Sequence, residues 1–170
     1  DRDLAAESDA QMREAGQAAG TGDPWELTLL GDALLRRRLW ERSLPVLERV
    51  LASDLGEKGD LGPRAARNLG LTLLHLGKWD EGIQALGNLP DHGQDPEMTL
   101  EIARQGARLG RFAEARRQLE RLLEMKQQDR NAAAEADLLL QRCRILEGDK
   151  KGAAEWLLRI WSSPTNPVRD

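Results

Sequence analysis

The apolar and polar positions of the chain repeat a two-helix pattern four times. Each copy begins with an apolar run of helical period, and in the first three copies this run has a small residue near its centre. A short break that often holds Gly follows, and then a second amphipathic run. The residues that directly follow the breaks are Trp40, Trp79, Phe112 and Lys150, and they lie 39, 33 and 38 positions apart. The pattern predicts four stacked helical hairpins, at about 24–57, 63–95, 96–129 and 134–167.

Small residues mark the places where the two helices of a predicted hairpin cross. They are Gly31, Gly70 and Ala103 in the first three copies. A small side chain there lets two helices approach closely, and an aromatic side chain after the break fills the gap at their joined end. The fourth copy departs from the pattern, because Gln141 stands at the crossing and Lys150 follows the break. The second helices open with further small residues: Ser43, Gly82, Ala115 and Ala153.

This arrangement resembles the tetratricopeptide repeat over residues 23–167, although the tyrosines usual in that family are absent. The resemblance implies an all-α fold, a right-handed superhelical array of antiparallel helical hairpins in which each hairpin covers its neighbour's apolar face. It also implies a scaffold module without catalysis of its own, which binds a peptide or a partner domain in its concave groove.

Both ends of the predicted array look incomplete. Residues 1–22 are expected to form an N-terminal helix, at 3–18, and a linker. No capping helix follows the last hairpin, so an apolar face with Leu157, Ile160 and Trp161 is left uncovered. We therefore expect either self-association through this face or a longer parent protein, as the missing initiator Met also indicates.

The composition excludes several classes of protein. Hydrophobic residues make up 40% of the 170 residues, with one Phe and no Tyr, and the many leucines favour helices over strands. One Cys and two His are too few for a structural zinc site, so we expect no metal and no cofactor. No apolar run approaches the ~20 residues that span a bilayer. The net charge of −4 argues against a nucleic-acid partner.

Catalysis is not expected from the available side chains. Cys143 lies between Arg142 and Arg144, which would lower the pKa of its thiol. A nucleophile also needs a base, and the two histidines, His75 and His92, belong to another hairpin and to a loop. A buried, inert cysteine is therefore the expected state.

In tetratricopeptide arrays the first helix of each hairpin lines the concave surface. This resemblance implies candidate partner-binding residues in which arginine is prominent: Trp25, Arg36, Arg64, Arg67, His75, Arg104, Arg108 and Arg142. Arginine side chains match carboxylates, so an acidic or C-terminal peptide is the expected ligand, unless these arginines are simply solvated. The clamp that holds chaperone tails is not expected, since Thr28 and Asp32 occupy its first positions and Asp32 would repel a carboxylate.

An alternative class rests on the last segment. The stretch GAAEWLLRIWSSPTNP resembles the end of the superhelical part of soluble lytic transglycosylases of bacterial envelopes. The resemblance implies a bacterial, periplasmic parent enzyme that acts on peptidoglycan through a domain not present here. The compartment, cytoplasmic or periplasmic, stays open between the two alternatives.

Overall fold

The computed structural model describes residues 23–53, 61–89, 94–125 and 130–162. These residues form eight α-helices and no strand, which confirms the predicted all-α fold. The chain divides into two compact units, Asp1–His92 and Gly93–Asp170, each described by itself. The helix predicted at 3–18 lies outside the described residues.

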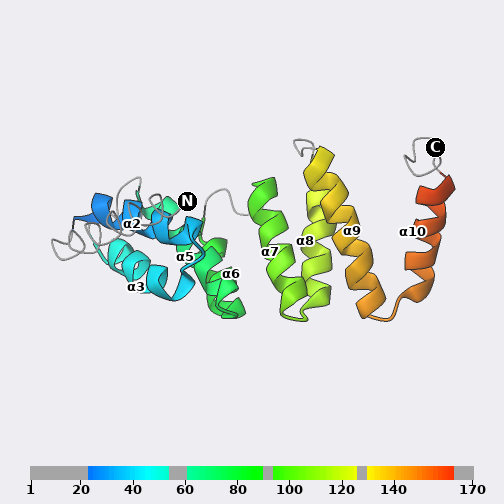
Figure 1. The fold of residues 1–170 in the computed structure, drawn as a ribbon, viewed down its shortest axis with the longest axis horizontal. Coiled ribbons are helices and arrows are strands. Elements are labelled where there is room, and N and C mark those ends of the chain that lie inside the picture. Colours follow the sequence, from blue (N-terminus) through cyan, green and yellow to red (C-terminus); the bar gives the residue numbers. More distant parts are fainter. Residues whose placement is uncertain (1–22, 54–60, 90–93, 126–129, 163–170) are drawn as a thin grey trace, which may run out of the picture. The chain divides into compact units, whose positions relative to one another are not determined.

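The first unit contains two helical hairpins. Its helices are α2 (Pro24–Arg36), α3 (Trp40–Leu51), α5 (Leu61–His75) and α6 (Trp79–Gly87). Helix α2 packs on α3 and α5 on α6, while α5 also contacts both α2 and α3 (Figure 1). The two hairpins therefore share a core instead of standing as separate pairs.

The second unit repeats this arrangement. Its helices are α7 (Pro96–Arg108), α8 (Phe112–Glu124), α9 (Arg130–Leu146) and α10 (Lys150–Ser162). Helix α9 contacts α7, α8 and α10, as Figure 1 shows for the yellow helix between its neighbours. Ala103, Ala115, Leu119 and Leu122 form its centre together with Cys143. The first helices of successive hairpins, α7 and α9, thereby lie against one another.

Helices α2 and α7, each the first helix of a hairpin, begin with the same Asp-Pro N-cap. The Asp23 carboxylate accepts a hydrogen bond from the backbone N–H of Trp25 (3.0 Å), and Asp95 accepts one from that of Glu97 (2.9 Å). The proline that follows each aspartate fills a position whose N–H has no helical partner, and its fixed φ suits the first turn. The Asp-Pro pairs thus fix where α2 and α7 start.

The turns inside the hairpins share one backbone conformation. Each has a residue with positive φ: Gly77 (82°), Gly110 (76°), Gly148 (94°) and, in the first hairpin, Arg38 (58°). The next amide then donates to a carbonyl five residues earlier, as Lys78 does to Leu73 at 2.9 Å in the second hairpin. Such a left-handed residue favours glycine, so Arg38 is the strained member of the set.

The α5/α6 crossing requires glycine on both helices. A Cβ added to Gly70 would lie 2.5 Å from Cγ of Leu86 and 3.1 Å from the carbonyl oxygen of Gly82. A Cβ on Gly82 would lie 2.9 Å from Leu74 and 3.0 Å from the Gly70 carbonyl oxygen. These distances leave no room for a methyl group, as the small crossing residues predicted.

In the fourth hairpin, polar side chains connect the two helices near their crossing. Gln141 is buried on α9 and its amide donates to the Asp137 carboxylate (3.4 Å). The buried indole of Trp156 on α10 donates to the other oxygen of Asp137 at 2.8 Å. A hydrogen bond from Trp156 to Asp137 therefore joins α10 to α9, one turn before Gln141, which stands where the other hairpins have a small residue.

Candidate functional site

The first helices of the first unit are joined by a buried carboxylate. Asp32 on α2 is only 7% exposed and forms an ion pair with Arg64 of α5. Its other oxygen accepts a hydrogen bond from Nδ2 of Asn68 at 2.6 Å. Arg64, one of the predicted binding residues, is thus engaged by Asp32 within the protein.

The first helices of the second unit are joined by an arginine. Nε and Nη2 of Arg104 on α7 donate to the two carboxylate oxygens of Glu135 on α9, at 2.7 and 2.6 Å. Nη1 donates to Glu101, one turn earlier on α7, at 3.0 Å. Every nitrogen of this guanidinium group therefore has a carboxylate partner within the protein.

This pairing shifts the titration of both partners. The hydrogen bonds from Arg104 lower the pKa of Glu135 below its ordinary value of 4.5. The hydrogen bond to Glu135, with a further one to Glu101, raises the pKa of Arg104. Glu135 therefore stays ionised to a lower pH than a free glutamate does, and its two hydrogen bonds hold Arg104 in place.

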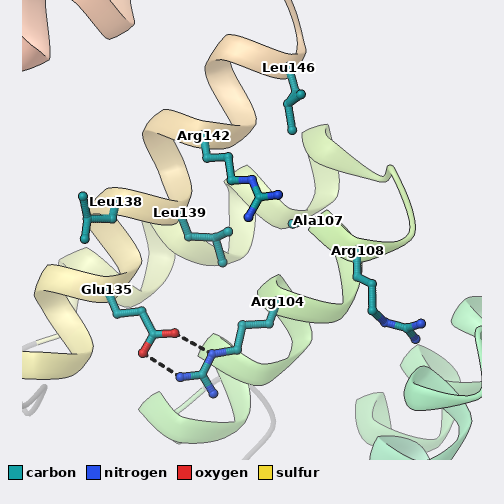
Figure 2. Close-up of a pocket in the computed structure, with 8 residues that line it drawn as sticks. All are labelled: Arg104, Ala107, Arg108, Glu135, Leu138, Leu139, Arg142 and Leu146. Atoms are coloured by element: carbon teal, nitrogen blue, oxygen red, sulfur yellow. Dashed lines mark hydrogen bonds and ion pairs between the residues drawn. The ribbon is translucent and has the colours of Figure 1, made fainter.

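A pocket of about 490 Å³ opens between α7 and α9. Figure 2 shows the paired Arg104 and Glu135 at one end, with Arg142 and Leu139 reaching from α9 toward α7. Leu146 follows beyond Arg142 and is 53% exposed. The lining residues are Arg104, Ala107, Arg108, Glu135, Leu138, Leu139, Arg142 and Leu146.

Three of the eight predicted binding residues meet in this pocket: Arg104, Arg108 and Arg142. Sequence reasoning missed Glu135 and Leu146. The signal was present, because positions 135, 138, 139, 142 and 146 follow the spacing of one helical face.

The other five predicted residues belong to the first unit. Trp25 is 57% exposed on α2, Arg36 ends α2, and Arg67 is half-buried on α5. Arg64 pairs with Asp32, as described above. The ring of His75 stacks on that of Trp40, with centroids 3.8 Å apart and planes 3° from parallel. His75 and Arg64 thus both contact residues of the first hairpin.

The structure confirms the expected burial of Cys143, and the flanking arginines do not lower the pKa of its thiol. The residue is fully buried on α9, and burial raises the pKa of its thiol, as does the nearby Glu147 carboxylate. The opposing effect of Arg142 is smaller, and Arg144 lies 3.8 Å from a Glu120 oxygen on α8. Desolvation therefore outweighs the local positive charge, and the thiol stays protonated.

The described residues contain no cluster of three His, Cys, Asp or Glu side chains suited to a metal ion. In the same part of the chain no helix is long and apolar enough to cross a membrane.

Comparison with known proteins agrees with this architecture. The family model for the tetratricopeptide repeat matches residues 28–96 and 100–167, so the chain belongs to the tetratricopeptide repeat family. Proteins built from such repeats generally mediate protein–protein interactions and are typically non-catalytic modules. Among curated proteins, none matches the sequence.

Three solved structures share the fold. "Crystal structure of MamA protein" matches with a TM-score of 0.69 and 14% identity, over 92% of this chain and 82% of that one. "MamA RS-1 ArsTM double mutant" gives 0.66 and 16%, over 87% and 80%. "Functional Characterization of Pseudomonas Aeruginosa pilF" gives 0.55 and 21%, over 89% and 65%. At these identities the likeness concerns the fold alone.

Proposed function

We propose that this protein is a non-catalytic scaffold module and that the pocket between α7 and α9 receives a segment of a partner protein. One observation carries the proposal. The pocket joins exposed apolar surface to a guanidinium group that has no ion-pair partner among the described residues, that of Arg142. Such a combination of apolar contact and one directed charge is typical of a peptide-binding surface.

The apolar part of the pocket favours association. Leu138 and Leu146 are 60% and 53% exposed, which leaves much of two large side chains in water. Covering apolar surface contributes about 25 cal/mol per Å². Leu139 is half-buried and packs on the core of the second unit, so that side of the pocket is held in place.

The wider proposal keeps the remaining candidates as secondary contacts. Trp25, Arg36, Arg67 and His75 belong to the first unit and stay predicted partner contacts of that unit by itself. An acidic partner is proposed because the pocket's available cation is Arg142. Self-association through Leu157, Ile160 and Trp161 also stays a prediction, because the side chains of these residues lie outside the described part of the structure.

A variant-dependent capture experiment tests the proposal. The full chain, immobilised, is exposed to a lysate of the source organism, and bound proteins are quantified by mass spectrometry. Leu146→Glu should remove the specific partner, whereas Leu29→Glu, at a leucine of α2 that is 57% exposed, should retain it. A photo-reactive residue at position 138 should then crosslink to one segment of that partner. Identical capture by both variants, or a crosslink to no protein, would contradict the proposal.

The alternative, a helical region of a larger cell-envelope enzyme, also stays a prediction. The gene sequence beyond residue 170 tests it, because that alternative requires a further domain with its own catalytic residues.

A further inference from the structure

We infer that the α7/α9 pocket selects a peptide segment with one carboxylate among large apolar side chains, and that Glu135 sets this limit of one. The inference rests on the proposed function of the same pocket. It names the chemistry of the ligand and the residue that determines specificity.

Arg104 is not available to a ligand. Its Nε, Nη1 and Nη2 atoms all donate to carboxylate oxygens, two of them to Glu135 in the parallel geometry that arginine and carboxylate groups favour. An incoming carboxylate would have to displace Glu135, which would then lie beside the ligand without its partner. This end of the pocket therefore holds two carboxylates, Glu135 and Glu101, around one guanidinium group, and offers no unused donor of Arg104.

Arg108 is tied to its own helix. Its Nε donates to the side-chain oxygen of Gln105 at 2.7 Å, and the Gln105 amide donates to Glu101 at 2.7 Å. Figure 2 shows the Arg108 guanidinium directed away from α9. Its position favours contact with the rim of a ligand over contact with groups held between the two helices.

Arg142 is the cation that the pocket presents. It forms no ion pair with any side chain in the described ranges, and its guanidinium group reaches from α9 toward Ala107 of α7 (Figure 2). Leu139 and Leu146 lie three residues before it and four after it on the same helix. A ligand that satisfies this surface has a carboxylate for Arg142 and apolar groups on both sides of it.

A second carboxylate held between α7 and α9 finds no further cation there, because Arg104 is paired and Arg108 is directed away from α9. It would lie near Glu135, a carboxylate whose two oxygens already accept from Arg104. Like charges at short range oppose binding, so a peptide with several acidic residues should bind no more tightly than a peptide with one. Glu135 thus excludes strongly acidic segments while leaving Arg142 free to bind one carboxylate.

Three synthetic peptides with blocked ends test this inference. They are GSLLQQQLLSG, GSLLEQQLLSG and GSLLEQELLSG, in which the two glutamates fall on one side of an extended chain. Each peptide is titrated into the full chain by fluorescence anisotropy, and the methyl NMR signals of Leu138 and Leu146 report the place of binding. We expect the one-glutamate peptide to bind about fivefold tighter than the glutamine peptide, the range of one partly exposed ion pair. The second glutamate should add less than twofold.

Two variants assign the residues. Arg142→Gln should abolish the preference for glutamate, and Glu135→Gln should allow the second glutamate to tighten binding about fivefold, because Arg104 is then released. Arg117→Gln and Glu124→Gln, two exposed positions on α8, are the matched controls and should leave every ratio unchanged.

The outcomes separate the inference from the proposed function. Equal binding of the glutamine and one-glutamate peptides, or a gain from the second glutamate in the unaltered chain, overturns the inference alone. The same holds if the preference survives Arg142→Gln. Absence of binding by all three peptides overturns the inference and counts against the proposed pocket as well.

Discussion

Asp32 and Arg104 occupy the same place in their hairpins, one residue after the small residue at the helix crossing, yet they carry opposite charges. Each pairs with a charged residue on the first helix of the following hairpin. Asp32 pairs with Arg64, and Arg104 pairs with Glu135. Arg64 and Glu135 each stand six residues before the crossing residue of their own hairpin, Gly70 and Gln141. The two ion pairs therefore join equivalent positions, but the acidic and basic partners are exchanged.

The two pairs should differ in their effect on stability. Asp32 is buried, so Asp32→Ala removes a carboxylate that satisfies both Arg64 and Asn68, and we expect a loss of about 1–3 kcal/mol in the free energy of unfolding. Glu135 is about half exposed, and Glu135→Ala should cost less than about 1 kcal/mol. Urea unfolding of each variant measures both. Equal losses would show that burial does not set the difference.

The ion pair of the second unit also predicts a dependence on pH. Because Arg104 lowers the pKa of Glu135 in the folded state, the pair stabilises the fold above the ordinary pKa of 4.5. That stabilisation should disappear as the pH falls through the lower, folded-state pKa. The difference in stability between the unaltered chain and Glu135→Gln should therefore shrink between pH 5 and strongly acidic pH, as unfolding curves would show. A constant difference would contradict the predicted shift.

The α5/α6 crossing should reject a single methyl group. Gly70→Ala forces the new Cβ against the fully buried Leu86 and the backbone of Gly82. Overpacking of this kind costs about 1–3 kcal/mol, and the better helix propensity of Ala offsets only part of that. Gly87→Ala is the matched control, because its Cβ meets nothing within 4 Å. Thermal unfolding should show a lower midpoint for the first variant and an unchanged or higher one for the second.

Arg38 offers a stabilising substitution. Its φ of 58° is the left-handed conformation that glycine supplies in the other three hairpin turns. Arg38→Gly should raise the stability by roughly 0.5–1 kcal/mol, since the relief of strain exceeds the added freedom of the unfolded chain. The neighbouring Arg37 has a φ of −91°, so Arg37→Gly should lower stability instead. Chemical denaturation distinguishes the two signs, and a loss in both variants would contradict the argument.

Cys143 should react slowly with thiol reagents. Its side chain is fully buried and burial raises its pKa, so both access and the thiolate fraction are reduced. Labelling by a chromogenic disulfide at pH 8 should be much slower in the folded chain than in urea. Rapid labelling under native conditions would show that α9 opens readily or that the flanking arginines dominate after all.

The sequence was sufficient for the hairpins because their signals are local. Gly70 and Gly82 at a crossing and a positive-φ Gly77 in the turn between them are readable within one repeat. The pairing of Asp32 was not readable in this way, since its partners lie 32 and 36 residues later on another helix. The sequence alone indicates that Asp32 would repel a carboxylate ligand, whereas the fold buries Asp32 and pairs it with Arg64 and Asn68.

The same distinction explains what was missed in the pocket. The arginines were found because the first helix of each hairpin has a recognisable inward face. Whether an arginine is already paired depends on the next repeat, as Glu135 shows for Arg104. For Cys143 the sequence favoured a buried, inert thiol, and the structure confirms the burial, which α7, α8 and α9 provide together.

The reversed polarity of the two first-helix pairs bears on the order of the hairpins. If the hairpins were interchangeable, the one that contains Asp32 could precede the one that contains Glu135, but this would set two carboxylates against each other. Placing Arg104 before Arg64 would likewise oppose two guanidinium groups. Charges at these positions therefore favour the present order of the hairpins. An array with the hairpins in another order would place like charges together between neighbouring first helices, even where the apolar faces match.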